Sequence, residues 1–165
     1  MQKIKSILND ASRELKIQNI ETSRLDSEIL LAYALGESKE YLVINSDNSL
    51  NDQKISKFRS LIRRRADGES ISNIIGKREF YGREFIVNCH VLDPRPDTEL
   101  IIDIIREIYI KEESFSILDL GTGSGCILTS ILLEFPNSVG IGTDISENAL
   151  NTAKINAEKY LLNDR

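Results

Sequence analysis

Glycines alternate with small hydroxyl residues in the stretch Gly121–Gly125, directly behind a short apolar segment that carries one acid, Asp119. Glycine has no Cβ atom, so its backbone can take positive φ angles and come close to a ligand. A helix that follows such a loop also offers N–H groups that have no partner inside the helix. Three glycines at this spacing therefore predict a loop that holds a ligand, in preference to an empty tight turn.

A second acid, Asp144, ends the next apolar segment of the chain. A carboxylate at the end of a strand can accept both hydroxyls of a ribose, because its two oxygens match two vicinal hydroxyls. Taken alone, Asp144 is also suited to cap the following helix, although Ser146 competes with it for that role. The loop and this acid together predict an adenosine-containing ligand.

The glycine spacing and the charge of Asp119 bear on which nucleotide binds. The order G-x-G-x-G differs from the G-x-G-x-x-G fingerprint of dinucleotide-binding proteins. A carboxylate near the loop repels a diphosphate and attracts an ammonium group. S-adenosylmethionine suits both acids, with its ribose at Asp144 and its cationic amino-acid end near Asp119 or the loop backbone. The predicted cofactor contacts are Asp119, Gly121, Thr122, Gly123, Ser124, Gly125 and Asp144.

The segments around the loop alternate between strand and helix patterns. A strand is expected over residues 116–120, a helix over 126–135, a strand over 138–144 and a helix over 146–162. This βαβα order predicts parallel strands with a right-handed crossover. Open sheets of this kind bind ligands at the carboxyl ends of their strands, which is where the loop falls.

The residues before position 76 predict a small α-helical bundle, because each expected helix has one apolar stripe that must pack on another helix. The first stripe comprises Ile4, Ile7, Leu8, Ala11 and Leu15. A second helix is expected to begin at Thr22 or Ser23 and to end at Gly36. Ser38 is expected to cap a short helix, and Asn51 or Asp52 a longer one; one more turn closes at Gly76.

The pattern then changes to two short aromatic and β-branched runs around Gly82, which predict a β-hairpin. Pro94 and Pro96 hold the following backbone extended. Asp97 or Thr98 is expected to cap the next helix.

Composition and charge exclude several classes of function. Residues 1–66 hold 12 Lys and Arg against 9 Asp and Glu, whereas residues 67–165 hold 9 against 17. The acidic part is poorly suited to grip a phosphate backbone, so direct DNA binding is not expected. The sequence has no apolar run near the ~18–20 residues of a membrane helix and no signal-peptide pattern. Cys89 and Cys126 lack metal-ligand spacing, so we expect reduced thiols, no metal site and a cytoplasmic protein.

Four stretches together resemble the bacterial HemK/PrmC family: REFYG, VLDPRPDTELII, ILDLGTGSGCI and VGIGTDISENAL. Members use S-adenosylmethionine to methylate the side-chain amide nitrogen (N5) of the glutamine in the Gly-Gly-Gln motif of class-1 peptide chain release factors. The resemblance covers essentially the whole chain, because RRRADGESISNIIGKREF also looks like the family's N-terminal domain. PRPDTE is its most specific element, since methyltransferases in general lack it.

The resemblance implies an α/β organisation: a helical substrate-docking domain over 1–75, a β-hairpin linker over 76–96, and the N-terminal part of a Rossmann-like methyltransferase domain over 97–165. It implies cofactor contacts at Gly121–Gly125 and Asp144, with PRPDTE beside the cofactor pocket. It also implies a release factor as protein substrate and a monomeric enzyme.

The chain departs from the family most seriously in lacking its Asn-Pro-Pro-Tyr motif. In the family, the asparagine side chain and a proline carbonyl of that motif are expected to accept both hydrogens of the substrate amide and so orient its nitrogen. We therefore predict no catalytic residue in this chain. Ser70, where a proline is usual, and Asp93, where an aliphatic residue is usual, leave the cofactor argument intact.

The expected sheet is incomplete, with two parallel strands where ~5–6 are usual. We therefore expect the N-terminal portion of a longer enzyme or a truncated relative, with exposed apolar faces, an unpaired sheet edge and poor stability of residues 116–165 alone. Two rival functions stay open. One is a dinucleotide-binding oxidoreductase, and the other is a truncated, inactive protein that binds partners through the helical bundle.

The remaining polar features favour structural roles. His90 is expected at the surface or in packing, and Cys126 in packing, although a helix start can lower a thiol pKa slightly. Glu99 is a weaker candidate for the lining of the cofactor pocket. A basic cluster is expected to be a solvated helix face, or else a docking surface for an acidic patch of the release factor or for ribosomal RNA; it comprises Lys54, Lys57, Arg59, Arg63, Arg64 and Arg65.

Overall fold

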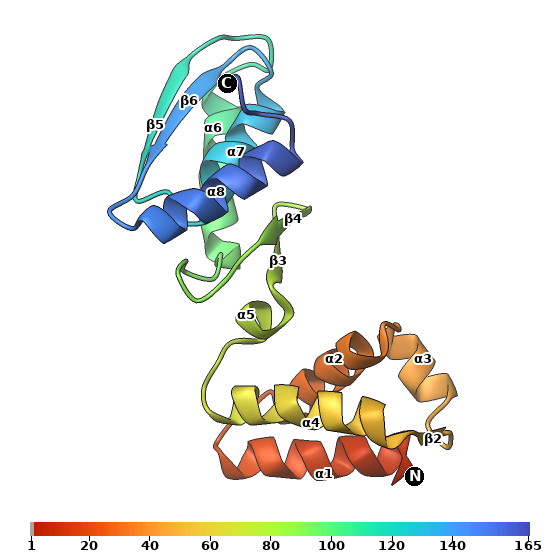
Figure 1. Cartoon of the computed structure of the whole chain (residues 1–165). Helices are drawn as coiled ribbons and strands as arrows, with labels where there is room; N and C mark the ends of the chain where they lie inside the picture. Colours follow the sequence, from red (N-terminus) through yellow and green to blue (C-terminus); the bar gives the residue numbers. More distant parts are fainter. Residues whose placement is uncertain (1) are drawn as a thin grey trace. The chain divides into compact units, whose positions relative to one another are not determined.

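The computed structural model of the chain describes residues 2–165. The chain divides into two compact units, one ending at Ile75 and the other spanning Gly76–Arg165. Each unit has buried residues of its own. Figure 1 labels the helices and strands that make up each unit.

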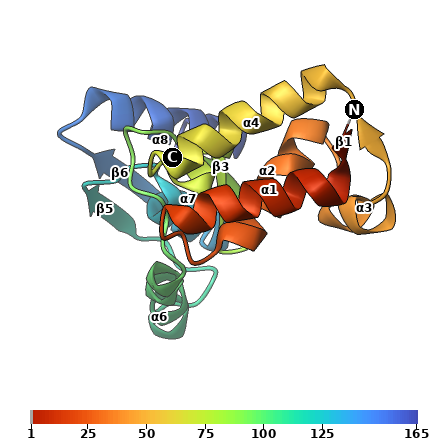
Figure 2. The same cartoon turned by 90° about the horizontal axis from the view of Figure 1, so that it is seen from below.

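The first unit is mainly helical. In chain order it contains β1 (Gln2–Lys3), α1 (Ile4–Ile17), α2 (Ser23–Leu35), α3 (Lys39–Ile44), β2 (Ser49–Leu50), α4 (Asp52–Ala66) and α5 (Ile71–Ile75). The short strands β1 and β2 pair antiparallel, with Gln2 opposite Leu50. Because β1 leads into α1 and β2 leads into α4, this pairing holds the first turns of both helices at one end of the unit. Figure 2 shows α1 and α4 lying side by side.

The predicted apolar stripe of α1 is buried, which confirms the helical bundle. The same buried cluster contains Leu30 and Leu31 of α2 and Phe58 and Ile62 of α4. All the residues of the stripe can be buried together because residues three and four apart share one face of a helix, and this face of α1 packs against its neighbours.

Helix boundaries in this unit follow the predicted signals closely. The side chain of Asn51 accepts the N–H of Lys54 at 2.9 Å and so caps α4. Ser38 caps α3 in the same way, by accepting the N–H of Tyr41. α2 begins at Ser23 and stops before the left-handed Gly36, as expected, but Thr22 makes no side-chain capping bond.

The second unit contains β3 (Lys77–Phe80), β4 (Arg83–Ile86), the 3₁₀ helix η1 (Pro96–Glu99), α6 (Leu100–Ile108), β5 (Ser116–Leu120), α7 (Cys126–Glu134), β6 (Val139–Thr143) and α8 (Glu147–Lys159). β3 and β4 form the predicted hairpin, and β5 and β6 form the predicted parallel pair. The expected cap of the helix after the prolines is wrong. A 3₁₀ turn that starts at Pro96 leads directly into α6, so neither Asp97 nor Thr98 caps it.

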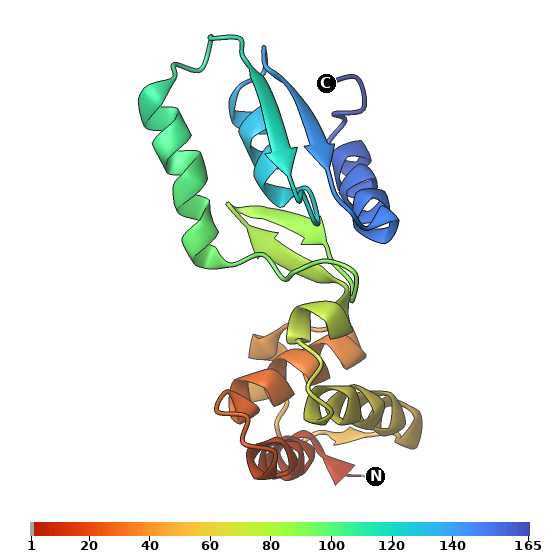
Figure 3. The ribbon, with the colours of Figure 1, turned by 90° about the vertical axis from the view of Figure 1, so that its left-hand side faces the viewer.

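The parallel pair has one covered and one open face. The register pairs Leu118 with Ile141, and both side chains are mostly exposed, at 60% and 65%. Figures 1 and 3 show α6, α7 and α8 on the same side of the pair. Within residues 2–165, β5 has β6 as its only strand partner. The predicted exposed apolar face and unpaired edge are therefore confirmed.

The hairpin packs within the second unit. Its Phe80 and Phe85 are almost fully buried and meet edge to face, with ring centroids 6.2 Å apart. They share a cluster with Ile102 of α6 and with Ile131 of α7.

Among residues 2–165, none of the helices has the length and apolar character needed to cross a bilayer.

Candidate functional site

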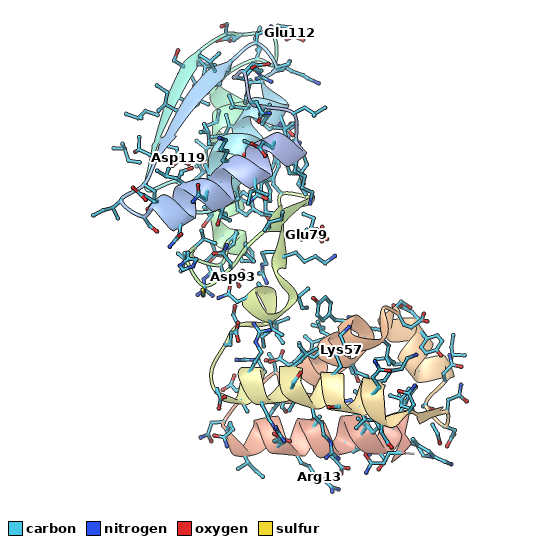
Figure 4. The ribbon with its side chains drawn as sticks, in the orientation of Figure 1. Arg13, Lys57, Glu79, Asp93, Glu112 and Asp119 are labelled. Atoms are coloured by element: carbon cyan, nitrogen blue, oxygen red, sulfur yellow. The ribbon has the colours of Figure 1, made fainter. Side chains whose placement is uncertain are left out.

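The glycine loop lies where β5 and β6 both end. The register pairs Asp119 with Gly142 and Leu120 with Thr143, so the two strands finish at the same edge. Residues 121–125 follow β5, and Asp144 follows β6 directly. Figure 4 shows Asp119 near this end of the pair. The structure thus brings the predicted loop and both predicted acids together at one sheet edge, as parallel pairing requires.

The loop backbone takes the conformation that its glycines allow. The φ angles are 78° at Gly121, 56° at Gly123 and 74° at Gly125, a region that residues with a Cβ rarely enter. At Gly125 space adds a second constraint, because a Cβ there would lie 3.1 Å from the Cβ of Ala153 on α8. Gly125 therefore allows the loop to pack closely against α8.

The outer part of the loop is open. A Cβ placed on Gly121 would meet no atom within 4 Å, and one on Gly123 would meet only the Gly121 carbonyl at 4.0 Å. Behind this part, the N–H groups of Gly121 and Thr122 both donate to the Thr143 carbonyl at 2.8 Å. The loop is thus anchored to the end of β6 while its first two glycines border free space.

Asp144 is joined to the loop as well as to its own helix. One carboxylate oxygen accepts the N–H of Gly123 at 2.9 Å, and the other accepts the N–H of Ser146 at 2.9 Å. The N–H groups of Ser146 and Gly123 hold the pKa of this carboxyl below its usual range, because they stabilise the charged form. Ser146 itself caps α8 by accepting the N–H of Ala149. Asp144 is therefore an anion that is free of the capping role.

Asp119 is held at the start of the loop. Its carboxylate accepts the hydroxyl of Thr122 at 2.8 Å, and the side chain is half-buried. Thr122 in turn is buried against β6, where a Cβ on Gly142 would come within 3.2 Å of its side chain. The predicted contacts Thr122 and Ser124 are both buried, at 8% and 3% exposed.

Cys126 follows the loop at the first position of α7. It is buried in the same cluster as Phe80 and Phe135. Burial raises the pKa of its thiol, so the slight lowering considered from its place at a helix start is wrong. Its packing role is confirmed, and His90 is exposed, as expected.

Sequence reasoning missed the side chain that ties the loop to the hairpin. Asn156 of α8 is fully buried and donates to the Ser124 carbonyl at 2.8 Å. The same side chain donates to and accepts from the backbone of Ile86 at the end of β4. The available signal was a polar residue on the buried face of α8, in line with Ala149 and Thr152.

Glu99, at the end of PRPDTE, also has a structural partner. Its carboxylate accepts the N–H of Tyr81 in the hairpin turn at 2.9 Å. The hydroxyl of Tyr81 donates to Asp103 of α6 at 2.7 Å. These contacts fix the PRPDTE segment and the first turns of α6 against the hairpin.

A cavity of about 550 Å³ lies between α7, β6 and α8. It is lined by leucines, alanines and loop-side residues such as Thr122 and Gly125. It therefore lies on the helical side of the sheet, behind the loop.

Among residues 2–165, no group of three or more His, Cys, Asp or Glu side chains is placed to hold a metal ion.

The basic cluster of the first unit contains residues that form ion pairs and residues that are simply exposed. Arg65 forms a largely buried ion pair with Asp26 of α2 at 2.8 Å, and Arg64 forms an exposed pair with Glu69. The remaining members are exposed: Lys54, Lys57, Arg59 and Arg63. Arg65 is thus a structural residue, and only the rest of the cluster forms a solvated helix face.

Two family models match the chain in succession. A PrmC N-terminal domain matches residues 6–76, and a methyltransferase domain matches residues 111–164. The second match and the parallel pair with its loop define residues 111–164 as part of a Rossmann-like methyltransferase domain.

Curated proteins match across almost the whole chain. A "Bifunctional methyltransferase" of Rickettsia conorii is 41% identical, with 98% of this chain and 36% of that protein covered. "Release factor glutamine methyltransferase" proteins of Koribacter versatilis and Bradyrhizobium diazoefficiens are each 36% identical, over 94% and 99% of this chain and 56% of their own length. This chain belongs to the HemK/PrmC family, and it spans between about a third and just over half the length of these relatives.

Proposed function

We propose that the chain contributes to methyl transfer from S-adenosylmethionine to the side-chain amide nitrogen of the glutamine in the Gly-Gly-Gln motif of class-1 peptide chain release factors. The observation that carries the cofactor part is the bond between Asp144 and Gly123, which joins a ribose-binding carboxylate to an open glycine loop. The names of the relatives support the substrate part.

The residues at the loop fit the cofactor. Each Asp144 oxygen uses one lone pair on a backbone N–H, so further lone pairs remain for the two ribose hydroxyls. The open space at Gly121 and Gly123 gives the nucleoside access to the loop backbone. Asp119 adds a negative charge that suits an ammonium group. The proposed contacts remain the seven residues predicted from the sequence.

A dinucleotide fits the same residues less well. A diphosphate at the loop would approach the carboxylate of Asp119, and like charges repel. Asp144 also already occupies the Gly123 N–H that a phosphate oxygen would need. The geometry therefore favours a sulfonium nucleoside over a dinucleotide as the ligand, and so a methyltransferase over an oxidoreductase.

S-adenosylmethionine, when bound, supplies a methyl group on an electrophilic sulfonium sulfur. The residues of this chain then bind and orient the nucleoside. Asp144 is ionised at neutral pH, as an ordinary aspartate is, and the lowering of its pKa extends the charged range to more acidic pH. Orientation of the acceptor amide is assigned to the family's Asn-Pro-Pro-Tyr motif, and this sequence has no consecutive prolines. We infer that the chain binds cofactor and that methyl transfer needs that motif.

The helical unit completes the proposal. We assign residues 1–75 to docking of the release factor, residues 76–96 to a hairpin linker and residues 97–165 to cofactor binding. The proposed protein acts in the cytoplasm as a monomer and contacts no DNA. The exposed members of the basic cluster are available to an acidic patch on the substrate.

A methylation assay tests the proposal. Labelled S-adenosylmethionine is incubated with a class-1 release factor, using this chain and the full product of its reading frame. We expect labelling only with a protein that carries the Asn-Pro-Pro-Tyr motif, and none of a release factor whose Gly-Gly-Gln glutamine is changed to alanine. Labelling that survives loss of this glutamine would exclude the assigned substrate.

A further inference from the structure

Asn156 makes three hydrogen bonds from a fully buried position on α8. Its Nδ2 group donates to the Ser124 carbonyl at 2.8 Å and to the Ile86 carbonyl at 2.9 Å. Its Oδ1 atom accepts the N–H of Ile86 at 2.8 Å. One side chain therefore connects α8, the glycine loop and the end of β4.

The chemistry of these partners selects a carboxamide. Two of the three groups are carbonyls, which need N–H or O–H donors, and the third is an N–H, which needs an acceptor. A carboxylate accepts but cannot donate, and an aliphatic side chain does neither. Each group left without a partner at this depth would carry the cost of an unsatisfied buried polar group. Asparagine thus satisfies all three partners with one planar group.

The contact to Ser124 fixes one peptide plane of the loop. The Ser124 carbonyl and the Gly125 N–H belong to the same planar peptide unit. Asn156 holds the carbonyl edge of this plane, and the Thr122 carbonyl accepts the Gly125 N–H at 2.8 Å on the other edge. A plane held at both edges resists rotation, so these two bonds restrain the backbone between Ser124 and Gly125.

We propose that Asn156 is a positioning residue for the glycine loop, fixing the Ser124–Gly125 peptide and linking it to β4, so that the loop is already shaped before a ligand binds. The part of this inference that concerns the cofactor rests on the proposed function. The part that concerns the loop backbone stands on the hydrogen bonds alone. Preorganised loops bind more tightly because little ordering remains to be done on binding.

The chain offers a matched control on the same helix. Tyr160 follows α8, and its hydroxyl donates to the Glu84 carbonyl of β4 at 2.8 Å. Tyr160→Phe therefore removes a hydrogen bond to the same hairpin strand without touching the loop. Asn156→Ala removes all three bonds, whereas Asn156→Asp keeps the acceptor for Ile86 and removes both N–H donors.

The first measurement is amide hydrogen exchange without ligand. We expect the amides of Gly123 and Gly125 to exchange at least about tenfold faster in Asn156→Ala and Asn156→Asp than in the unsubstituted chain, since a lost bond of this kind is worth roughly one such factor. Tyr160→Phe should leave both rates within about twofold of the unsubstituted chain. Unchanged loop exchange in the Asn156 variants, or equal acceleration by Tyr160→Phe, overturns the inference.

The second measurement is equilibrium dialysis with S-adenosylmethionine. We expect binding about tenfold weaker or worse in both Asn156 variants and unaltered in Tyr160→Phe. Full-strength binding by the variants overturns the positioning role. Absence of binding by the unsubstituted chain overturns the proposed cofactor instead, and the exchange data still decide the role of Asn156.

A measurement on the unsubstituted protein covers the case in which the variants fail to fold. Both Nδ2 protons of Asn156 are engaged, so they should exchange slowly with solvent and resonate as a fixed pair in an NMR spectrum. Rapid exchange of either proton would contradict the geometry on which the inference depends.

Discussion

The carboxylate of Asp144 accepts the backbone N–H of Gly123 at 2.9 Å, which joins the residue after β6 to the middle of the loop after β5. The two residues are 21 positions apart in the chain, and parallel pairing of β5 and β6 brings them together. The bond places the acid and the open part of the loop in one site. It also keeps the acid charged, because an N–H donor stabilises a carboxylate.

Removal of the Asp144 charge should weaken cofactor binding. We expect Asp144→Asn to lower the affinity for S-adenosylmethionine about tenfold or more, because hydrogen bonds to charged groups are stronger than neutral ones. Glu147→Gln is the matched control, since Glu147 is an exposed acid at the start of α8. Isothermal titration of both variants with S-adenosylmethionine measures the two affinities. Equal losses of affinity would show that the net charge of the protein matters and the position of the Asp144 carboxylate does not.

The pH dependence of the loop follows from the same carboxyl. Its pKa lies below the ordinary value of 3.8, so its contribution to stability is present above that value and is lost as the pH falls through the lower folded pKa. We expect the stability difference between the unsubstituted chain and Asp144→Asn to stay constant between about pH 5 and 8. Urea unfolding across this range measures it, and a difference that fades near neutral pH would indicate a raised pKa instead.

Much of this site could be predicted from the sequence because its signals are local. The glycines, the strand before them and the acid after the next strand each lie within short segments whose periodicity is clear. The bonds of Asn156 could not be predicted, since its partners Ile86 and Ser124 lie 70 and 32 residues away in the chain. Such contacts depend on how α8 packs, which no local pattern contains.

Two local expectations also failed for tertiary reasons. A helix start favours a lowered pKa for the thiol of Cys126, but burial of this thiol in the cluster around Phe135 has the larger effect and raises its pKa. The cap expected after the prolines is replaced by a 3₁₀ turn, because Pro96 has the fixed φ angle that suits a first helical position. In the first unit, the caps at Ser38 and Asn51 were predictable because each bond spans three residues.

The two arginine pairs of α4 should differ in their effect on stability. Asp26 is 6% exposed beside Arg65, so Arg65→Ala leaves a buried carboxylate unpaired and should cost about 3 kcal/mol. Arg64 and Glu69 are 46% and 30% exposed, so Arg64→Ala should cost less than about 1 kcal/mol. Denaturant unfolding of the two variants compares them, and similar losses would contradict the structural role of Arg65.

The open face of the parallel pair should tolerate polar residues. Leu118 and Ile141 are mostly exposed, so Leu118→Thr and Ile141→Thr should each change the free energy of unfolding by less than about 0.5 kcal/mol. Ile131 of α7 is 2% exposed, and Ile131→Ala should cost about 2–5 kcal/mol. A large loss from the strand variants would mean that this face is covered in solution. Poor stability of residues 116–165 alone stays a prediction, and denaturant unfolding of that isolated segment tests it.

The most direct test of the account is equilibrium dialysis of this chain against S-adenosylmethionine and, separately, against NAD. We predict saturable binding of S-adenosylmethionine that Asp144→Asn weakens, and no binding of NAD over the same concentrations. Binding of NAD in preference to S-adenosylmethionine would contradict the assignment of the loop and its two acids.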